Sequence, residues 1–406
     1  MILAVIFVLL IFVYSLISRV LGRTIITGPI LFTTAGILVP VFLPVSLEIE
    51  ENLKTLLFVA EMGLVLLLFT DASRIKLKEL LSIRQLPARL LSIGMLLTIF
   101  LGAVAALAVF PHLSIWEAAI LAAILAPTDA GLGQVIVSSP RVPLRIRNAL
   151  NVEAGLNDGM SVPFLMFFIA MAQPGSEGGG ILTRFLIEQL GYGVIIGIGI
   201  GLIGGLLLGW AHKKKWMAEP LEQLGLVTLP ILSIIFSEPT GASMFIISFV
   251  AGMASQVGFK EVGDHSVEFT EGWGQIFNLF VFFFLGLMIP QGWPKIESNL
   301  VVYAILSLTV IRMLPVAISL IGAHLKSSTV VFMGWFGPRG LASIVLGLVY
   351  IEQEAHLSGE PTIRLAVTMT VLLSIFAHGL SALPGTNLYA RRVAALTSDA
   401  PEIMKQ

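Results

Sequence analysis

Residues 122–133 read AAILAPTDAGLG, an apolar run that is interrupted by Pro127 and followed by Thr128 and Asp129. Proline removes a backbone hydrogen-bond donor and clashes with the preceding turn, and the glycines that follow loosen the next turn. A helix broken at this point leaves backbone C=O and N–H groups without helical partners beside the Asp129 carboxylate. A simple proline kink is the alternative interpretation, but a kink does not require an adjacent carboxylate.

The composition of the chain indicates that it folds in a lipid bilayer. Of its 406 residues, 56% are hydrophobic and only 12% are charged, whereas charged residues make up about a quarter of an ordinary soluble domain. A net charge of -1 offers no basis for binding nucleic acid. The absence of cysteine excludes disulfides, thiolate metal sites and cysteine nucleophiles.

Apolar runs long enough to cross a bilayer recur along the chain. A transmembrane helix needs about 20 mostly apolar residues, and charged residues, prolines and glycine clusters separate thirteen such runs. The predicted fold is therefore an all-α polytopic membrane protein with thirteen transmembrane helices. The predicted spans are roughly 2–20, 26–45, 54–71, 89–110, 115–138, 147–172, 183–211, 221–237, 240–256, 270–289, 298–322, 328–351 and 362–385.

Lys and Arg concentrate in alternate connections between these spans. Arg141, Arg145, Arg391 and the run 213–215 belong to one set of connections, whereas the intervening connections carry few basic residues, such as Arg184. Cytoplasmic loops of membrane proteins are enriched in Lys and Arg. The pattern predicts a multi-pass protein of the cell membrane, with its N-terminus outside and its C-terminus in the cytoplasm.

Residues 334–347, GWFGPRGLASIVLG, form a second broken apolar helix, with Arg339 between Pro338 and Gly340. The broken spans, the fifth and the twelfth, are seven apart, and an odd shift reverses the direction of the chain across the membrane. Inverted repeats whose discontinuous helices cross near the midplane build cation sites in transporters. We predict a first repeat at 1–172 (spans 1–6), a linking helix at 183–211, a second repeat at 221–385 (spans 8–13) and a short cytoplasmic tail at 386–406.

A third polar stretch, NALNVEAGLNDGMSVPFLMFF at residues 148–168, places Glu153, Asn157 and Asp158 on less than two turns of a helix. A charge at mid-membrane costs at least about 2.5 to 3.5 kcal/mol on insertion scales and normally faces a partner or a water-filled cavity. Burial disfavours the charged form of a carboxylic acid. Such a group exchanges a proton for a hard cation, and the two compete for the same oxygens.

The motifs APTD (126–129), EAGLND (153–158) and FGPRGLAS (336–343) together resemble the core of the monovalent cation/proton antiporters, in particular the NhaP type with an Asn-Asp pair. The resemblance extends over essentially the whole chain. It implies a secondary active antiporter that exchanges a monovalent cation, Na+ first and Li+ or K+ next, for H+ in a lipid bilayer. It also implies a homodimer, and no enzymatic activity or cofactor beyond the transported ions.

The resemblance assigns residues to the ion site. Asp158 matches the aspartate that binds the cation and the proton, and Asn157 matches the Asn of the pair, which is a second Asp in electrogenic relatives. Thr128 and Asp129 match the unwound Thr-Asp, whose Thr carbonyl joins Asp158 as a ligand of the monovalent cation. Asp71, in LLLFTDAS, is a candidate for a further acidic residue at the site.

Glu153 and Arg339 match a buried pair that ties the sixth span to the second broken helix. Arg312, in the eleventh span, is predicted either to pair inside the bundle or to lie at the end of a tilted helix. Ala154 stands where many members of the family have a serine, so the resemblance implies a missing hydroxyl ligand.

One neutral and one acidic residue in the pair predict electroneutral 1:1 exchange by alternating access. Two other classes of protein stay open at this point. An intramembrane aspartyl protease would use Asp129 and Asp158 as paired acids, although a Gly-Asp pair is expected there. A cation channel would use the same broken helices without a titrating carboxylate.

Overall fold

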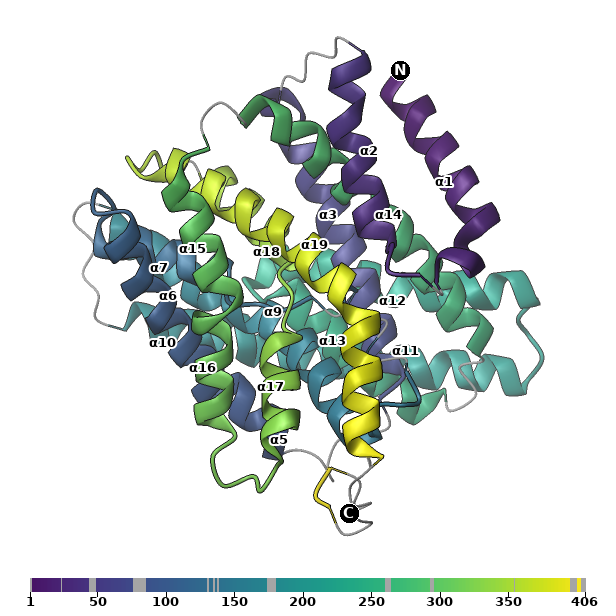
Figure 1. Ribbon diagram of the computed structural model, residues 1–406. Coiled ribbons are helices and arrows are strands. Elements are labelled where there is room, and N and C mark those ends of the chain that lie inside the picture. Colours follow the sequence, from purple (N-terminus) through teal and green to yellow (C-terminus); the bar gives the residue numbers. More distant parts are fainter. Residues whose placement is uncertain are drawn as a thin grey trace.

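A computed structural model describes residues 2–22, 24–43, 49–75, 85–129, 131–133, 136, 139–173, 180–259, 264–292, 296–353, 355–394 and 400–402. All regular structure within these ranges is helical, and Figure 1 shows the helices as one bundle. The elements are α1 (Ile2–Leu21), α2 (Gly28–Phe42), α3 (Ile49–Ser73), α5 (Gln85–Arg89), η1 (Leu90–Gly94), α6 (Met95–Val109), α7 (Ile115–Ile124), α9 (Leu144–Ala172), α10 (Ile181–Phe185), η2 (Leu186–Tyr192), α11 (Gly193–Lys213), α12 (Glu219–Thr240), α13 (Met244–Gly258), α14 (Asp264–Gly292), α15 (Ser298–Leu308), α16 (Val310–Ser319), α17 (Ser327–Trp335), α18 (Leu341–Glu352) and α19 (Glu360–Val393).

Helices occupy all thirteen ranges that the sequence predicts as spans. Nine helices of the described residues are long and apolar enough to cross a bilayer, while α2, α7, α13 and α18 are apolar but shorter. The all-helical, multi-pass character of the prediction is therefore confirmed. Three further basic residues of the sequence, Lys76, Arg84 and Lys260, lie outside the described residues.

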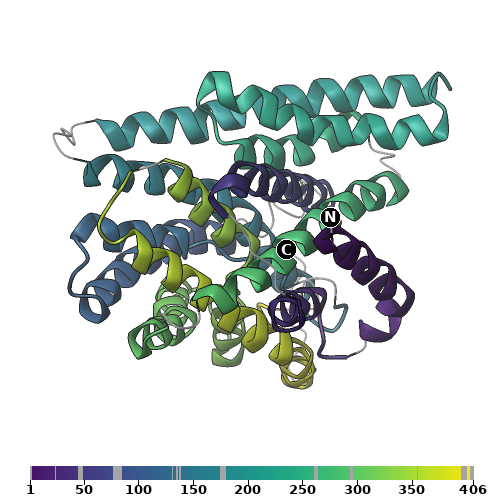
Figure 2. The same cartoon turned by 90° about the horizontal axis from the view of Figure 1, so that it is seen from above.

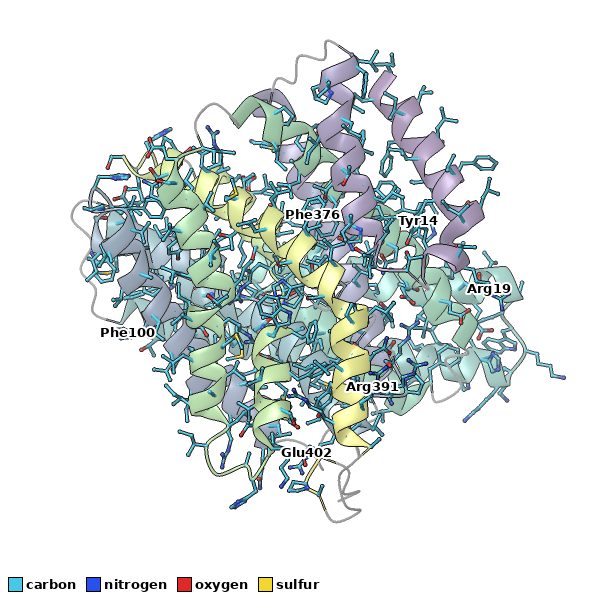
Figure 3. The ribbon with its side chains drawn as sticks, viewed as in Figure 1. Tyr14, Arg19, Phe100, Phe376, Arg391 and Glu402 are labelled. Carbon is cyan, nitrogen blue, oxygen red and sulfur yellow. The ribbon has the colours of Figure 1, made fainter. Side chains whose placement is uncertain are left out.

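The outer surface of the bundle is apolar, as lipid contact requires. Leu9, Phe12 and Leu16 of α1 and Phe100 of α6 are each more than half exposed, and Figure 3 shows Phe100 at the edge of the molecule. Large exposed apolar surfaces are unusual in soluble proteins but match a hydrocarbon solvent.

Glycines spaced four apart let α11 pack closely against α13. A Cβ atom built on Gly201 would lie 2.3 Å from the carbonyl oxygen of Ala251, and one on Gly205 would lie 2.3 Å from that of Ser255. Only glycine permits two helix backbones to approach in this way, and small-residue stripes are a common device of membrane helices. In Figure 2 these teal helices form one side of the molecule, opposite the green and yellow helices of the C-terminal part.

The two predicted helix breaks are present. α7 ends at Ile124, and residues 127–129 that follow it are not helical. α17 ends at Trp335, and residues 336–340 run without helical structure to the start of α18. Both breaks expose backbone polar groups inside the bundle, where water is scarce and each group needs a partner.

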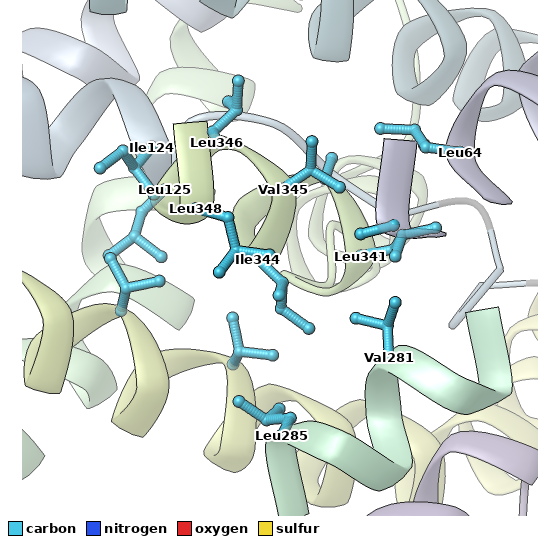
Figure 4. Packing of buried hydrophobic residues seen from close by; sticks show 14 of the residues in the cluster. Leu64, Ile124, Leu125, Val281, Leu285, Leu341, Ile344, Val345, Leu346 and Leu348 are labelled. Carbon is cyan, nitrogen blue, oxygen red and sulfur yellow. The ribbon is translucent and has the colours of Figure 1, made fainter. Parts of the chain in front are cut away.

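An apolar cluster surrounds α18 after the second break. Ile344, Val345 and Leu348 of α18 pack with Leu64 of α3 and Leu285 of α14 (Figure 4). All five side chains are at most 9% exposed.

Candidate functional site

The two broken helices meet backbone to backbone. The N–H of Asp129, in the first break, donates a hydrogen bond of 2.8 Å to the carbonyl oxygen of Pro338, in the second. This bond pairs two groups that neither helix can satisfy within itself. Segments that are more than 200 residues apart in the sequence therefore cross at the level of Asp129.

The Asp129 carboxylate accepts backbone N–H groups from the start of α18 and from the turn that follows Asp129. Its Oδ2 accepts the N–H of Leu341 at 2.7 Å, at the start of α18. Its Oδ1 accepts the N–H groups of Gly131 and Leu132, at 2.7 and 3.3 Å. A negative charge at a helix N-terminus is favoured by the orphan N–H groups and by the helix dipole. Asp129 thus holds both breaks in place.

The positively charged Arg339 side chain binds backbone carbonyls, as the negatively charged Asp129 side chain binds backbone N–H groups. The Arg339 side chain is fully buried, and its Nη1 donates to the carbonyl oxygens of Ala126 and Pro127, the latter at 2.8 Å. These carbonyls follow the C-terminal end of α7, where a cation is favoured. The backbone N–H of Arg339 donates to Ser374 Oγ of α19 at 2.7 Å. The crossing is therefore held by an acid at one half-helix and a base at the other.

Glu153 binds Arg312 and not Arg339. Its two carboxylate oxygens accept from Nη1 and Nη2 of Arg312 at 2.5 and 3.0 Å, and the two side chains are only 3% and 4% exposed. The predicted pair of Glu153 and Arg339 was wrong. Arg339 is taken up by the carbonyls at the end of α7, while Glu153 faces α16. Gly337 leaves room for this pair, since a Cβ there would lie 2.1 Å from Arg312 Nε.

Asn157 supports the unwound segment. Its Nδ2 donates to Thr128 Oγ1 at 2.9 Å, and its Oδ1 accepts the N–H of Thr128 at 3.3 Å. The amide accepts from a backbone N–H that the break has freed and also donates to the threonine hydroxyl, whereas an ionised carboxylate could only accept. Asn157 and Thr128 are thus brought together.

Asp158 lies in a pocket beside the crossing. It is 4% exposed, and its Oδ1 has no hydrogen-bond partner among the described residues. The pocket has a volume of about 40 Å³, and Asp71, Asp129 and Ala154 also line it. The remaining lining residues are Leu64, Leu67, Leu68, Gly131, Glu271, Gln275, Leu341 and Ala342. The structure thus gathers three predicted aspartates and the alanine in one pocket.

Sequence reasoning missed the contribution of α14 to this pocket. Glu271 and Gln275 line it, and Asn278 is 2% exposed and lies one turn further along the same helix. Their spacing of four and three residues puts them on one helical face. That polar stripe within the predicted span 270–289 was the available signal, but it does not indicate which neighbour the stripe faces.

Substitution of Gly340 tests the close packing of the second break against Asp129. A Cβ built on Gly340 would lie 2.0 Å from Asp129 Oδ2, so Gly340→Ala is expected to displace the carboxylate and to lower the free energy of unfolding by about 1 to 3 kcal/mol. Thermal unfolding in detergent measures this change. Gly347→Ala is the matched control on α18, because its nearest neighbour would be 3.6 Å away. Equal melting temperatures for the two variants would contradict the proposed packing.

Residues 6–385 match the family described as "Sodium/hydrogen exchanger, transmembrane". The chain belongs to the sodium/hydrogen exchanger family. This is a family of transporters and not of enzymes, so neither the protease nor the channel interpretation is supported. The resemblance to cation/proton antiporters is confirmed at the level of the family.

Two curated relatives of the exchanger show how far the similarity extends. The chain is 28% identical to the Na(+)/H(+) antiporter of Schizosaccharomyces pombe over 313 residues, which are 68% of this chain and 65% of that protein. It is 24% identical to the K(+)/H(+) antiporter NhaP2 of Shewanella sp. (strain MR-4) over 374 residues, 90% of this chain and 63% of that protein. The chain spans less than two thirds of the length of either relative.

The fold is that of a solved antiporter. The sodium proton antiporter MjNhaP1 from Methanocaldococcus jannaschii superposes with a TM-score of 0.74 at 19% sequence identity, covering 96% of this chain and 98% of that one. At this level of identity the likeness concerns the arrangement of the helices.

Proposed function

We propose that this exchanger moves a monovalent cation in one direction and H+ in the other, with both ions competing for Asp158. The observation that carries the proposal is the unpartnered, buried carboxylate oxygen of Asp158 in a pocket beside two broken helices. A buried carboxylate without a partner is costly in its charged form. Binding either a proton or a cation removes that cost, so the site is stable when loaded with one of them.

The neighbours of Asp158 support a one-for-one exchange. Asp129 already accepts three backbone N–H groups, and the neutral Asn157 is engaged with Thr128. Asp158 is then the carboxylate that binds a proton and a cation in turn during each transport cycle. Moving one cation inward and one proton outward on a single carboxylate transfers no net charge.

We propose that Asp158 and Thr128 supply oxygen ligands to the cation, with Asp129, Asn157 and Asp71 placed around them. Hard cations bind carboxylate and carbonyl oxygens. Ala154 lines the pocket without offering an oxygen, so water completes the shell there. Na+ is the first candidate, in line with the family description, and Li+ and K+ are the alternatives.

The proposed topology has thirteen membrane crossings, with inverted repeats at 1–172 and 221–385 around a linking helix at 183–211. It rests on the thirteen helical ranges and on the crossing of the fifth and twelfth. The alternating loop charges support an outside N-terminus and a cytoplasmic C-terminus, including the tail at 386–406, in the cell membrane. The family resemblance supports a homodimer.

Exchange by the purified chain in proteoliposomes tests this function. A pH-sensitive dye inside the vesicles is expected to report proton movement when Na+, Li+ or K+ is added outside, and none when an impermeant organic cation replaces them. Because the exchange is proposed to be electroneutral, its rate should not change when potassium and valinomycin impose a membrane potential during the Na+ assay. A rate that follows the potential would contradict the 1:1 stoichiometry, and absence of proton movement with all three ions would contradict antiport.

A further inference from the structure

An ion pair lies beside the Asp158 pocket and is not used by the chemistry described above. Arg74, which directly follows α3, donates from Nη2 to Glu271 Oε2 of α14 at 2.6 Å. The Arg74 side chain is 44% exposed and that of Glu271 is 19% exposed. Glu271 lines the pocket together with Asp71 and Asp158. The pair therefore joins α14 to the end of α3, and its acidic member lines the pocket.

The polar face of α14 continues from this pair toward the crossing. Gln275, one turn after Glu271, also lines the pocket. Asn278 follows at the next turn, and its Oδ1 has no hydrogen-bond partner in the part of the chain that the structure describes. A Cβ built on Gly131 would lie 3.5 Å from Asn278 Nδ2, so this amide reaches the unwound segment next to Asp129. Three polar side chains, those of Glu271, Gln275 and Asn278, thus lie on one helical face that runs from the ion pair toward the crossing.

We propose that Glu271 is the first cation-binding residue on the way to Asp158 and that Arg74 closes this route when no cation is bound. The proposal rests on the antiport function proposed above. An arriving cation displaces the guanidinium from Glu271 and passes along the α14 face to Asp158. Glu271 is thereby a residue that determines how well the exchanger captures its cation from solution.

The physical properties of the pair suit such a gate. A partly exposed ion pair contributes little to stability, because water screens it and two long side chains lose freedom to form it. A cation that offers a better fit to the carboxylate can therefore replace the guanidinium. Arg74 remains charged at every physiological pH, so its release from Glu271 is governed by ion binding and not by titration of the arginine.

The effects expected of substitutions at Glu271 and Arg74 follow from the change in charge at the pocket. In Glu271→Gln the Arg74 charge is no longer neutralised, and it lowers the local concentration of cations. In Arg74→Ala one positively charged competitor for the Glu271 carboxylate is removed. The first change should weaken cation capture and the second should strengthen it.

The test measures the cation dependence of exchange in proteoliposomes with Na+ as the probe. Glu271→Gln is expected to raise KM for Na+ roughly two- to fivefold, the equilibrium equivalent of a partly exposed ion pair. Arg74→Ala is expected to lower KM. Glu188→Gln is the matched control, since it breaks the Arg184 pair of 2.8 Å, which does not involve the residues that line the pocket. A wild-type KM in Glu271→Gln would overturn the proposal.

A charge-swapped double variant, Arg74→Glu with Glu271→Arg, separates a gate from a structural strut. If the ion pair has only a structural role, the swap restores the pair, and KM would return to the wild-type value. The gate is not restored, because an arginine now lines the pocket, so KM is expected to stay raised. Recovery of the wild-type KM would overturn the proposal. If the wild-type protein itself exchanges no cation, the proposed function fails, whereas normal exchange with an unaffected Glu271→Gln overturns the gate alone.

Discussion

Asp158→Asn is expected to abolish cation-dependent proton movement in sealed proteoliposomes. The amide has nearly the size and shape of the carboxylate, but it holds no exchangeable charge and takes up no proton near neutral pH. Neither a cation nor H+ would gain from binding it, so the competition that couples the two ions disappears. Dye-based exchange with Na+, Li+ and K+ measures the loss over a range of pH.

The stability of Asp158→Asn distinguishes loss of transport from loss of fold. Asp158 is 4% exposed, and its Oδ1 has no partner among the described residues. Replacing an uncompensated buried acid by a neutral amide removes a desolvation cost, so the melting temperature in detergent should equal or exceed that of the wild type. Asp158→Glu keeps the titrating group and is the positive control. Wild-type exchange by Asp158→Asn would refute the proposed mechanism.

Arg312→Ala is expected to cause the largest loss of stability. The change leaves the Glu153 carboxylate buried without its guanidinium, and breaking a buried ion pair costs about 3 to 5 kcal/mol. The two hydrogen bonds of 2.5 and 3.0 Å are both lost. Thermal unfolding in detergent, together with the yield of monodisperse protein, measures the effect.

A double variant and a control variant are compared with Arg312→Ala. Replacing both partners, Glu153→Leu with Arg312→Met, removes the buried charges together and should recover much of the stability, since well-packed apolar residues often substitute for a buried pair. Arg184→Ala breaks an exposed pair with Glu188 and should leave the melting temperature unchanged. If the melting temperature of Arg312→Ala equals that of the wild type, the pair of Glu153 and Arg312 does not stabilise the bundle.

Local sequence was sufficient to predict where the chain breaks and where its polar groups concentrate. Pro127 and Pro338 interrupt apolar helices for reasons that lie within a few residues of each, and the structure has non-helical segments at both. Glu153, Asn157 and Asp158 share one helix, so their clustering is also a local property.

The partners of the charged groups were decided only by the tertiary structure. Helical periodicity determines which side chains share a face, but it does not determine which helix that face meets. Glu153 could have met either buried arginine, and the outcome depended on Arg339 being taken up by the carbonyls of Ala126 and Pro127. The same holds for Asp129, whose backbone partners come from both broken helices.

The residues with which α14 lines the pocket are the clearest example of what the sequence could not predict. Glu271 lies near one end of a predicted span, where a carboxylate is ordinary, and only its contact with Arg74 and its place beside Asp158 distinguish it. By itself, the sequence determined an all-helical membrane protein with two broken helices and a buried aspartate. The tertiary structure decided which charges neutralise one another, because pairing energies depend on distances between helices that are remote in the chain.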